Sequence, residues 1–257
     1  MIPLEYDENC PFPYNNFTYR IDLVAPATSR SSSMASKACT TPFAEDGTSK
    51  LVFRISNTKA EGLTQTNRVQ NEVAALYLAR SSVVGSQASA APSLIPAVYD
   101  WQAAGDGTAV GWILMECMPG VCLDQHFEEL PDIQKRELID QLAGVFAAVQ
   151  RATLPETITG YGGLDINGNG AIVSGATTTL RGGPWPTFID FLKNKLSGEL
   201  KEADESEVLQ GWHKNGVRQR IDHFLETGIF KNASEANIDT QKRVLLHSDI
   251  SMCGSTS

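Results

Sequence analysis

The chain has 257 residues, of which 42% are hydrophobic and 20% charged, a length and composition that suit one large core or two lobes. Its net charge of −9 argues against nucleic acid as a partner, and no run of Lys and Arg indicates binding to an anionic membrane. No segment approaches the roughly 18 apolar residues of a membrane span, and the amino terminus lacks the pattern of a signal peptide. Together with five scattered cysteines, these features predict a cytoplasmic protein with reduced thiols.

Strands and turns dominate the first part of the sequence. Phe17–Val24 alternates and is rich in β-forming residues, which predicts a strand. Residues 25–42 are rich in Ser, Thr, Ala and Pro and predict a flexible insertion. Asp46 and Gly47 then predict a turn into a second strand over Lys50–Ile55. The insertion can therefore vary in length without disturbing the sheet.

A helix and two further strands are expected next. Over Asn67–Arg80 the apolar residues recur with the period of a helix, forming a stripe of Val69, Val73, Leu76 and Tyr77. Residues 81–93 predict another loop. Leu94–Trp101 is expected as an edge strand, because Pro96 cannot donate to a ladder, and the apolar segment Gly111–Met118 as an internal strand.

Helices dominate the second half. Apolar stripes predict helices over Pro131–Arg151, Trp185–Leu200 and Val217–Glu226. The expected core face of the first helix consists of Leu138, Leu142, Val145, Phe146 and Val149. Between the first two helices, Gly162–Gly175 predicts a tight hairpin. Its turn matches the opening of an EF-hand loop, but the twelfth position is Ala176 rather than Glu, so we expect no calcium site.

Two parts of the sequence indicate chemistry. Arg54 lies on the second predicted strand, where it is either a group that binds phosphate or carboxylate, or an exposed basic residue. Glu72 lies near the buried stripe of the following helix, where it is either solvated or, because an unpaired carboxylate there is costly, paired with a cation. Near the carboxyl end, the apolar run Val244–Leu246 predicts a strand that leads into His247 and Asp249. A lone His-x-Asp is weak evidence, because it occurs by chance in many chains, and its place after an apolar run and three predicted helices makes it more specific.

These motifs, in this order between Phe17 and Cys253, resemble the aminoglycoside phosphotransferase and choline kinase-like family of the protein-kinase-like fold, particularly its fungal members. The resemblance implies an α+β fold of two lobes, with a β-rich nucleotide-binding lobe over residues 1–118 and a helical lobe over residues 119–257. It further implies transfer of phosphate from ATP to the hydroxyl of a small molecule, with ATP and Mg²⁺ as cofactors. It does not imply which molecule accepts the phosphate.

The resemblance also assigns catalytic and phosphate-binding roles. Asp249 would be the catalytic base, and His247 would order the loop that carries it. Arg54 and Glu72 would pair with each other and hold the nucleotide phosphates.

Two further segments would contact the nucleotide. Glu116, Cys117 and Met118 lie in a segment that resembles the hinge between the lobes, whose backbone would bind adenine, although a core strand leaving through a turn fits the same pattern. Asn15 and Asn16 stand where a glycine-rich phosphate loop is expected, and they would supply turn geometry and donors.

The chain departs from the family's pattern at both ends. The segment Pro11–Asn16 has no glycine, and Gly254 stands where the family has a metal-binding Asn, five residues after Asp249. The later strand with a second metal-binding Asp is absent. We therefore expect a chain that is truncated within the catalytic loop and has negligible turnover. The alternative is a non-catalytic remnant, similar to a pseudokinase, that binds nucleotide or a protein partner.

Overall fold

The computed structural model describes most of the chain. The described residues are 1–4, 14–29, 37–60, 62–86, 94–105, 110–121, 123, 126–179, 182–209, 211–228 and 242–247.

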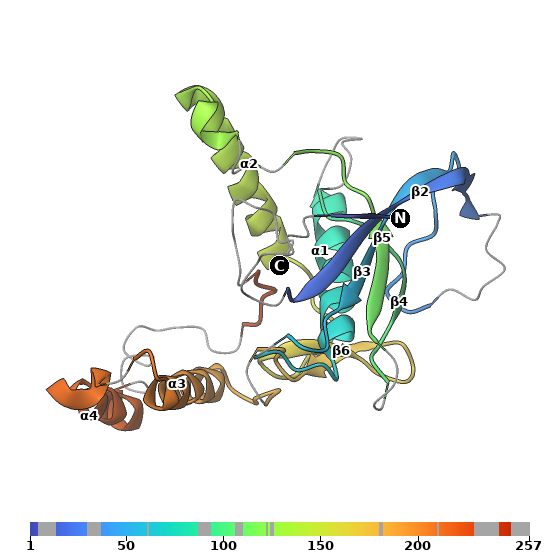
Figure 1. The fold of residues 1–257 in the computed structure, drawn as a ribbon. Helices are drawn as coiled ribbons and strands as arrows, with labels where there is room; N and C mark the ends of the chain where they lie inside the picture. The colour runs from blue at the N-terminus through green and yellow to red at the C-terminus, as the bar shows by residue number, and fades with distance from the viewer. Residues whose placement is uncertain are drawn as a thin grey trace.

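Five antiparallel strands form one sheet in the order β1-β2-β3-β5-β4 (Figure 1). The strands are β1 (Ile2–Pro3), β2 (Asn16–Ala27), β3 (Thr48–Ser56), β4 (Val98–Gln102) and β5 (Trp112–Glu116). The four strands expected between Phe17 and Met118 are all present, with β4 at the edge and β5 between β3 and β4. The start of the predicted insertion was wrong, because β2 continues to Ala27, opposite Thr48. In this strand order the middle strand is β3, which carries Arg54.

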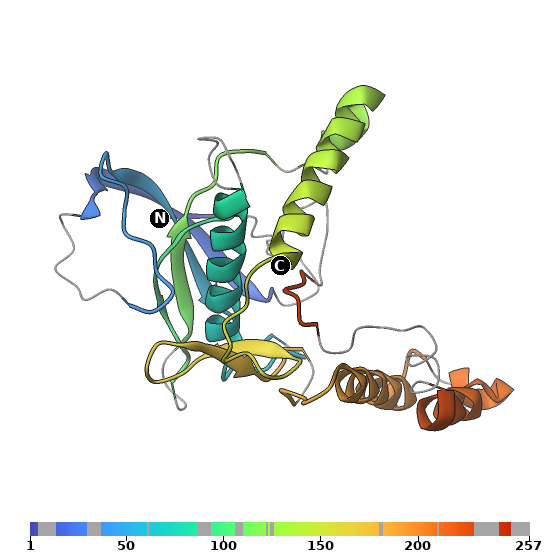
Figure 2. The same ribbon diagram turned by 180° about the vertical axis from the view of Figure 1, so that it is seen from behind.

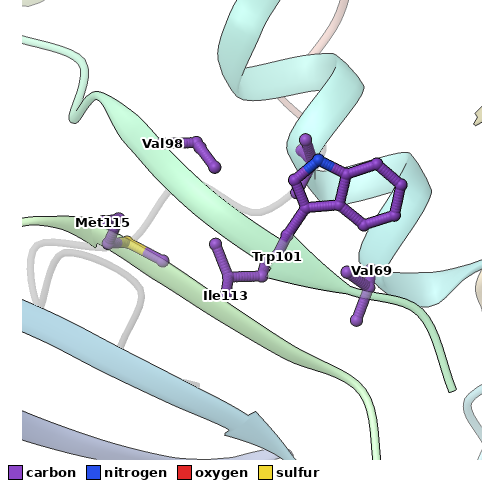
Figure 3. Close-up of a cluster of buried hydrophobic side chains, with 6 residues drawn as sticks. Val69, Val98, Trp101, Ile113 and Met115 are labelled. Atoms are coloured by element: carbon purple, nitrogen blue, oxygen red, sulfur yellow. The ribbon is translucent and has the colours of Figure 1, made fainter. Parts of the chain in front are cut away.

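Helix α1 (Arg68–Ser86) lies against one face of this sheet. A buried cluster joins the helix to the sheet, and Figure 3 shows how its side chains converge from α1, β4 and β5. The cluster consists of Val69, Val73, Val98, Trp101, Ile113 and Met115. Because Ile113 is the register partner of Arg54, and paired residues of an antiparallel ladder share a face, Arg54 also lies on the face that α1 covers.

Helix α1 is longer than its apolar stripe predicts. It continues to Ser86 instead of ending at Arg80, because Val83 is buried against the last turns of α2 and the Ser82 hydroxyl donates to the Ala148 carbonyl at 2.6 Å. Tyr77, expected in the core, is exposed. A second buried stripe, formed by Ala74 and Leu78, instead packs against the segments that follow α2.

The predicted hairpin is present as β6 (Gly163–Ile166) and β7 (Ile172–Gly175), and it lies across α1. Its turn is closed by Asn167, whose side-chain oxygen accepts the N–H groups of Asn169 and Ala171, both at 3.0 Å. The backbones approach closely: a Cβ on Gly163 would lie 2.2 Å from the Ala176 carbonyl oxygen and 2.8 Å from Asn71 Oδ1. Glycine is therefore required for this docking.

The three helices of the second half are α2 (Asp132–Gln150), α3 (Phe188–Glu205) and α4 (Val217–His223), the last followed by a π-turn over Phe224–Gly228. Short 3₁₀ turns occupy Phe127–Glu129 and Trp212–Asn215. Only the carboxyl end of α2 packs against α1, whereas α3 and α4 lie away from the sheet in both views (Figures 1 and 2). No described helix is both long enough and apolar enough to cross a membrane.

The predicted core face of α2 is buried only near the carboxyl end of the helix, where Val149 is buried and Val145 packs against the same cluster. Leu142 is 42% exposed, and the residues of α2 that are fully buried are Ala148 and Val149, near its end. Ile133 and Ile139 are also exposed, at 68% and 54%. The periodicity is real, but most of α2 extends beyond the part of the fold that would cover it.

Candidate functional site

An ion pair connects the middle strand of the sheet to the helix that covers it. Arg54 Nη1 lies 2.7 Å from Glu72 Oε1, and the two side chains are 17% and 24% exposed. Arg54 is held in β3 between Thr18 of β2 and Ile113 of β5, while Glu72 lies in the first half of α1. The predicted contact between these two side chains is therefore present. A partly buried, charge-assisted pair of this kind fixes the direction of the guanidinium group.

A second arginine, which sequence reasoning missed, lies beside this pair. Arg68 is the first residue of α1 and is only 7% exposed. Its Nη2 donates to the Asn15 carbonyl at 2.5 Å and to Asn16 Oδ1 at 2.9 Å. Its Nη1 is buried without a hydrogen-bond partner in the described structure. The signal in the sequence was an arginine at the start of a helix, where the helix dipole disfavours a cation.

Burial lowers the pKa of the Arg68 guanidinium from its ordinary value. Attraction to Glu72 opposes this decrease, and repulsion from Arg54 adds to it. Glu72 therefore attracts both arginines, although its ion pair is with Arg54. These three side chains carry two positive charges and one negative charge.

Asn15 and Asn16, which were predicted to donate to phosphate, act here as acceptors. The Asn15 carbonyl accepts from Arg68 and from the N–H of Asn57 at 3.0 Å, and the Asn16 side-chain oxygen accepts from Arg68. Asn16 is buried at the start of β2. These contacts attach the start of β2 to α1. Whether the two residues also contact phosphate stays a prediction.

The segment predicted as a hinge follows β5. Glu116 ends that strand, and its carboxylate lies 3.0 Å from Arg80 Nη1 of α1 and accepts the N–H of Ala97 at 3.0 Å. The Glu116 side chain therefore stabilises the strand end instead of facing a ligand. Cys117 and Met118 continue, half-buried, toward α2. Their predicted contact with a base is untested.

The register of β3 and β5 sets the spacing between these two parts of the site. Arg54 pairs with Ile113, and Leu51 pairs with Glu116. Three residues of a strand span about 10 Å. The start of the segment predicted to bind the base is therefore about 10 Å from the backbone of Arg54, measured along the strands.

The approach to the His-x-Asp motif differs from its prediction. Residues 242–247 form no strand, so the strand predicted over Val244–Leu246 was wrong. Leu245 packs against two buried clusters that include residues of α1, Ala74 and Leu78 in one and Ala79 and Val83 in the other. Leu246 is 63% exposed. His247 is exposed, and Asp249 lies outside the described residues, as does Gly254. The segment still reaches the helix that carries Glu72.

A pocket lies between Arg243 of this segment and the residues that follow α2. It has a volume of about 480 Å³, with Leu154, Pro155 and Ile158 among its apolar lining residues. The Arg243 guanidinium donates to the Thr159 carbonyl at 2.6 Å and lies 5.2 Å from the ring centre of Tyr161. No three His, Cys, Asp or Glu side chains gather to form a metal site in the described part of the chain.

The chain matches no protein-family model, no curated protein and no solved structure. The residues and contacts given above are therefore the basis on which a function can be assigned.

Proposed function

We propose that this protein is a phosphotransferase of the aminoglycoside phosphotransferase and choline kinase-like family, whose reaction is transfer of the terminal phosphoryl group of ATP to a small-molecule hydroxyl, and that the 257-residue chain itself has negligible turnover because Gly254 replaces the metal-binding Asn. The observation that carries the proposal is the 2.7 Å ion pair between Arg54 and Glu72. Kinase-like enzymes require a basic residue on the third strand that binds nucleotide phosphates and pairs with a Glu of the next helix. Arg54 on β3 and Glu72 on α1 have these positions.

The replacement of the usual Lys by Arg is compatible with this role. A guanidinium group carries a permanent positive charge and presents parallel N–H donors that match two phosphate oxygens. Glu72 orients one side of that group. The arrangement supports phosphate binding by Arg54.

The distance to the predicted hinge supports a nucleotide in particular. A separation of about 10 Å along β3 and β5 is of the order of the distance between the base and the outer phosphates of ATP. Cys117 and Met118 would bind adenine through their backbone groups. In this proposal residues 1–118 form the nucleotide-binding lobe and residues 119–257 belong to the helical lobe.

Asp249 would act as the base. It would accept the proton of the acceptor hydroxyl as its oxygen bonds to the terminal phosphorus and the bond to the bridging oxygen breaks, which leaves ADP. His247 would order the loop. Mg²⁺, when bound, would neutralise phosphate charge, and no described residue is assigned to hold it.

The test is calorimetric titration of the full chain with Mg²⁺–ATP. We expect saturable binding in the wild type and at least about tenfold weaker binding in Arg54→Gln, because a charge-assisted contact to phosphate is lost. Arg20→Gln, in an exposed ion pair on β2, is the matched control and should bind like the wild type. Equal affinity in Arg54→Gln and the wild type would exclude the proposed site.

A second candidate is a non-catalytic protein that binds nucleotide, and the observation that favours it is Gly254 at the position of the metal-binding Asn. The two candidates differ in turnover. ADP formation that depends on Mg²⁺ and is abolished in Asp249→Asn would favour the enzyme. Nucleotide binding without ADP formation would favour the non-catalytic protein.

A further inference from the structure

A buried positive charge lies at the amino end of α1, next to the proposed phosphate-binding pair. Arg68 is 7% exposed, and the pKa of its guanidinium responds to both Arg54 and Glu72. These three side chains carry two positive charges and one negative charge. Because Glu72 already forms an ion pair with Arg54, the charge of Arg68 is compensated only in part.

The hydrogen bonds of Arg68 leave part of its guanidinium group unused. Its Nη2 has two acceptors, the carbonyl of Asn15 and the side-chain oxygen of Asn16, and both are neutral. Its Nη1 is buried and has no hydrogen-bond partner among the described residues. A buried donor without an acceptor costs free energy, so a structure that retains one has a strong preference for an added acceptor.

The helix adds to the positive potential. Arg68 is the first residue of the 19-residue helix α1, and no acidic residue lies in its first turn. The amino end of a helix presents free N–H groups and a partial positive charge, which stabilise anions and disfavour cations. The partial charge at the helix end and the charge of Arg68 are therefore both positive. Together with the unpaired Nη1 donor, they favour a negatively charged ligand that can accept hydrogen bonds.

We propose that Arg68 and the amino end of α1 form a receptor for one phosphate group, adjacent to Arg54. The group is either an outer phosphate of the nucleotide, in which case the inference depends on the proposed function, or a free phosphate or pyrophosphate ion. A tetrahedral oxyanion fits because its oxygens accept from the guanidinium fork and from helix N–H groups together. Arg68 thereby becomes a binding residue in addition to the Arg54–Glu72 pair.

The first experiment measures the Tm of the full chain in increasing pyrophosphate, against sodium chloride of equal ionic strength. We expect a rise in Tm for the wild type that saturates with pyrophosphate concentration, as for any ligand that binds the native state alone. Arg68→Met should lose this rise, with an apparent affinity at least about tenfold weaker. Arg136→Met, on the exposed part of α2, is the matched control and should retain it.

Arg68→Lys guards against the possibility that Arg68→Met does not fold. It keeps the charge but loses the fork, so we expect pyrophosphate binding that is detectable and weaker than in the wild type. No pyrophosphate effect in the wild type, or equal effects in the wild type and both Arg68 variants, would overturn the proposal.

Calorimetry with ATP separates this inference from the proposed function. ATP binding that is unchanged in Arg68→Met but lost in Arg54→Gln would retain the proposed function and exclude the Arg68 receptor. Pyrophosphate binding that requires Arg68, without any ATP binding, would retain the receptor as a site for free phosphate and exclude the proposed function. ATP binding that weakens in both variants supports the two together.

Discussion

Residues of the same kind differ in burial between two regions of the molecule. One region is the sheet with α1, and the other is the outer helices α2–α4. Val73 of α1 is fully buried, whereas Ile133 of α2 is 68% exposed. The Arg54–Glu72 ion pair is short and partly buried, whereas Lys201 and Glu205 of α3 lie 3.9 Å apart with side chains at least 69% exposed. The contrast indicates that the free energy of folding is concentrated in the sheet and α1. Matched substitutions in the two regions should therefore have unequal effects.

The largest expected difference comes from a carboxylate placed in each region. Val73→Asp puts a charge at a site with no exposed surface, and we expect it to lower the free energy of unfolding by at least about 4 kcal/mol. Ile139→Asp, at an exposed site of α2, should change it by less than about 0.5 kcal/mol. Urea unfolding followed by circular dichroism measures both. A large loss in Ile139→Asp would show that α2 is covered in solution.

Glycine to alanine substitutions should have opposite signs in the two regions. Gly163→Ala forces a methyl group against the Ala176 carbonyl, and we expect a loss of about 1–3 kcal/mol from overpacking. Gly144→Ala, in α2 with no atom near its added Cβ, should gain about 0.5–1 kcal/mol through helix propensity. Thermal unfolding of both variants tests the pair. A stable Gly163→Ala protein would contradict the close approach of Gly163 to the Ala176 carbonyl and to Asn71 of α1.

A smaller difference in stability is expected when one charge is removed from an ion pair in each region, Arg54–Glu72 in the first and Lys195–Glu199 in the second. Glu72→Gln leaves Arg54 and Arg68 without the carboxylate that attracts both, and we expect a loss of about 1–2 kcal/mol, reduced by the partial exposure of the pair. Glu199→Gln, which removes the exposed partner of Lys195, should change stability by less than about 0.5 kcal/mol. The comparison is made by urea unfolding at low and high salt. Equal losses would mean that burial does not strengthen the Glu72 contact.

The smallest expected effect is a loss of stability at alkaline pH, caused by two groups in the region of the sheet. Burial raises the pKa values of Cys39 and Tyr99, so both groups stay protonated to a higher pH in the native state than in the unfolded state. Their contribution to stability is full below the unfolded pKa values, about 8.5 and 10, and is lost as the pH rises through the folded values. Tm measured between pH 7 and about 11 should fall less steeply in Tyr99→Phe than in the control Tyr77→Phe. Parallel curves would contradict a role for Tyr99.

The sheet was predictable because its strands alternate or are continuously apolar and are separated by strong turn signals. The position of Glu72 near a buried stripe indicated that its carboxylate needs a partner, and the resemblance to kinase-like proteins identified Arg54 as that partner. The position of Glu116 in its ion pair with Arg80 did not follow, because nothing local to β5 indicates which part of α1 lies across its end.

Errors in the prediction occurred where long-range packing decides the outcome. The last turns of α1 contain poor helix formers, and the burial of Val83 against α2 compensates for them. The run Val244–Leu246 has the composition of a strand but no neighbouring strand to pair with in the described structure. Periodicity predicted the apolar face of α2 but not how much of it the fold covers.

Helix α1 is attached to two neighbouring strands at two separate points. Glu72 binds Arg54 of β3, and Arg80 binds Glu116 of β5. The two attachment residues lie about 12 Å apart along the helix axis. Two such points resist both sliding of the helix along the sheet and rotation about its axis, which a single point cannot do. Glu72→Gln would release one point, and faster amide hydrogen exchange in the first turns of α1 than in the last would reveal it. The first turns of α1 would then move relative to the sheet, while the contact between Arg80 and Glu116 holds the last turns in place.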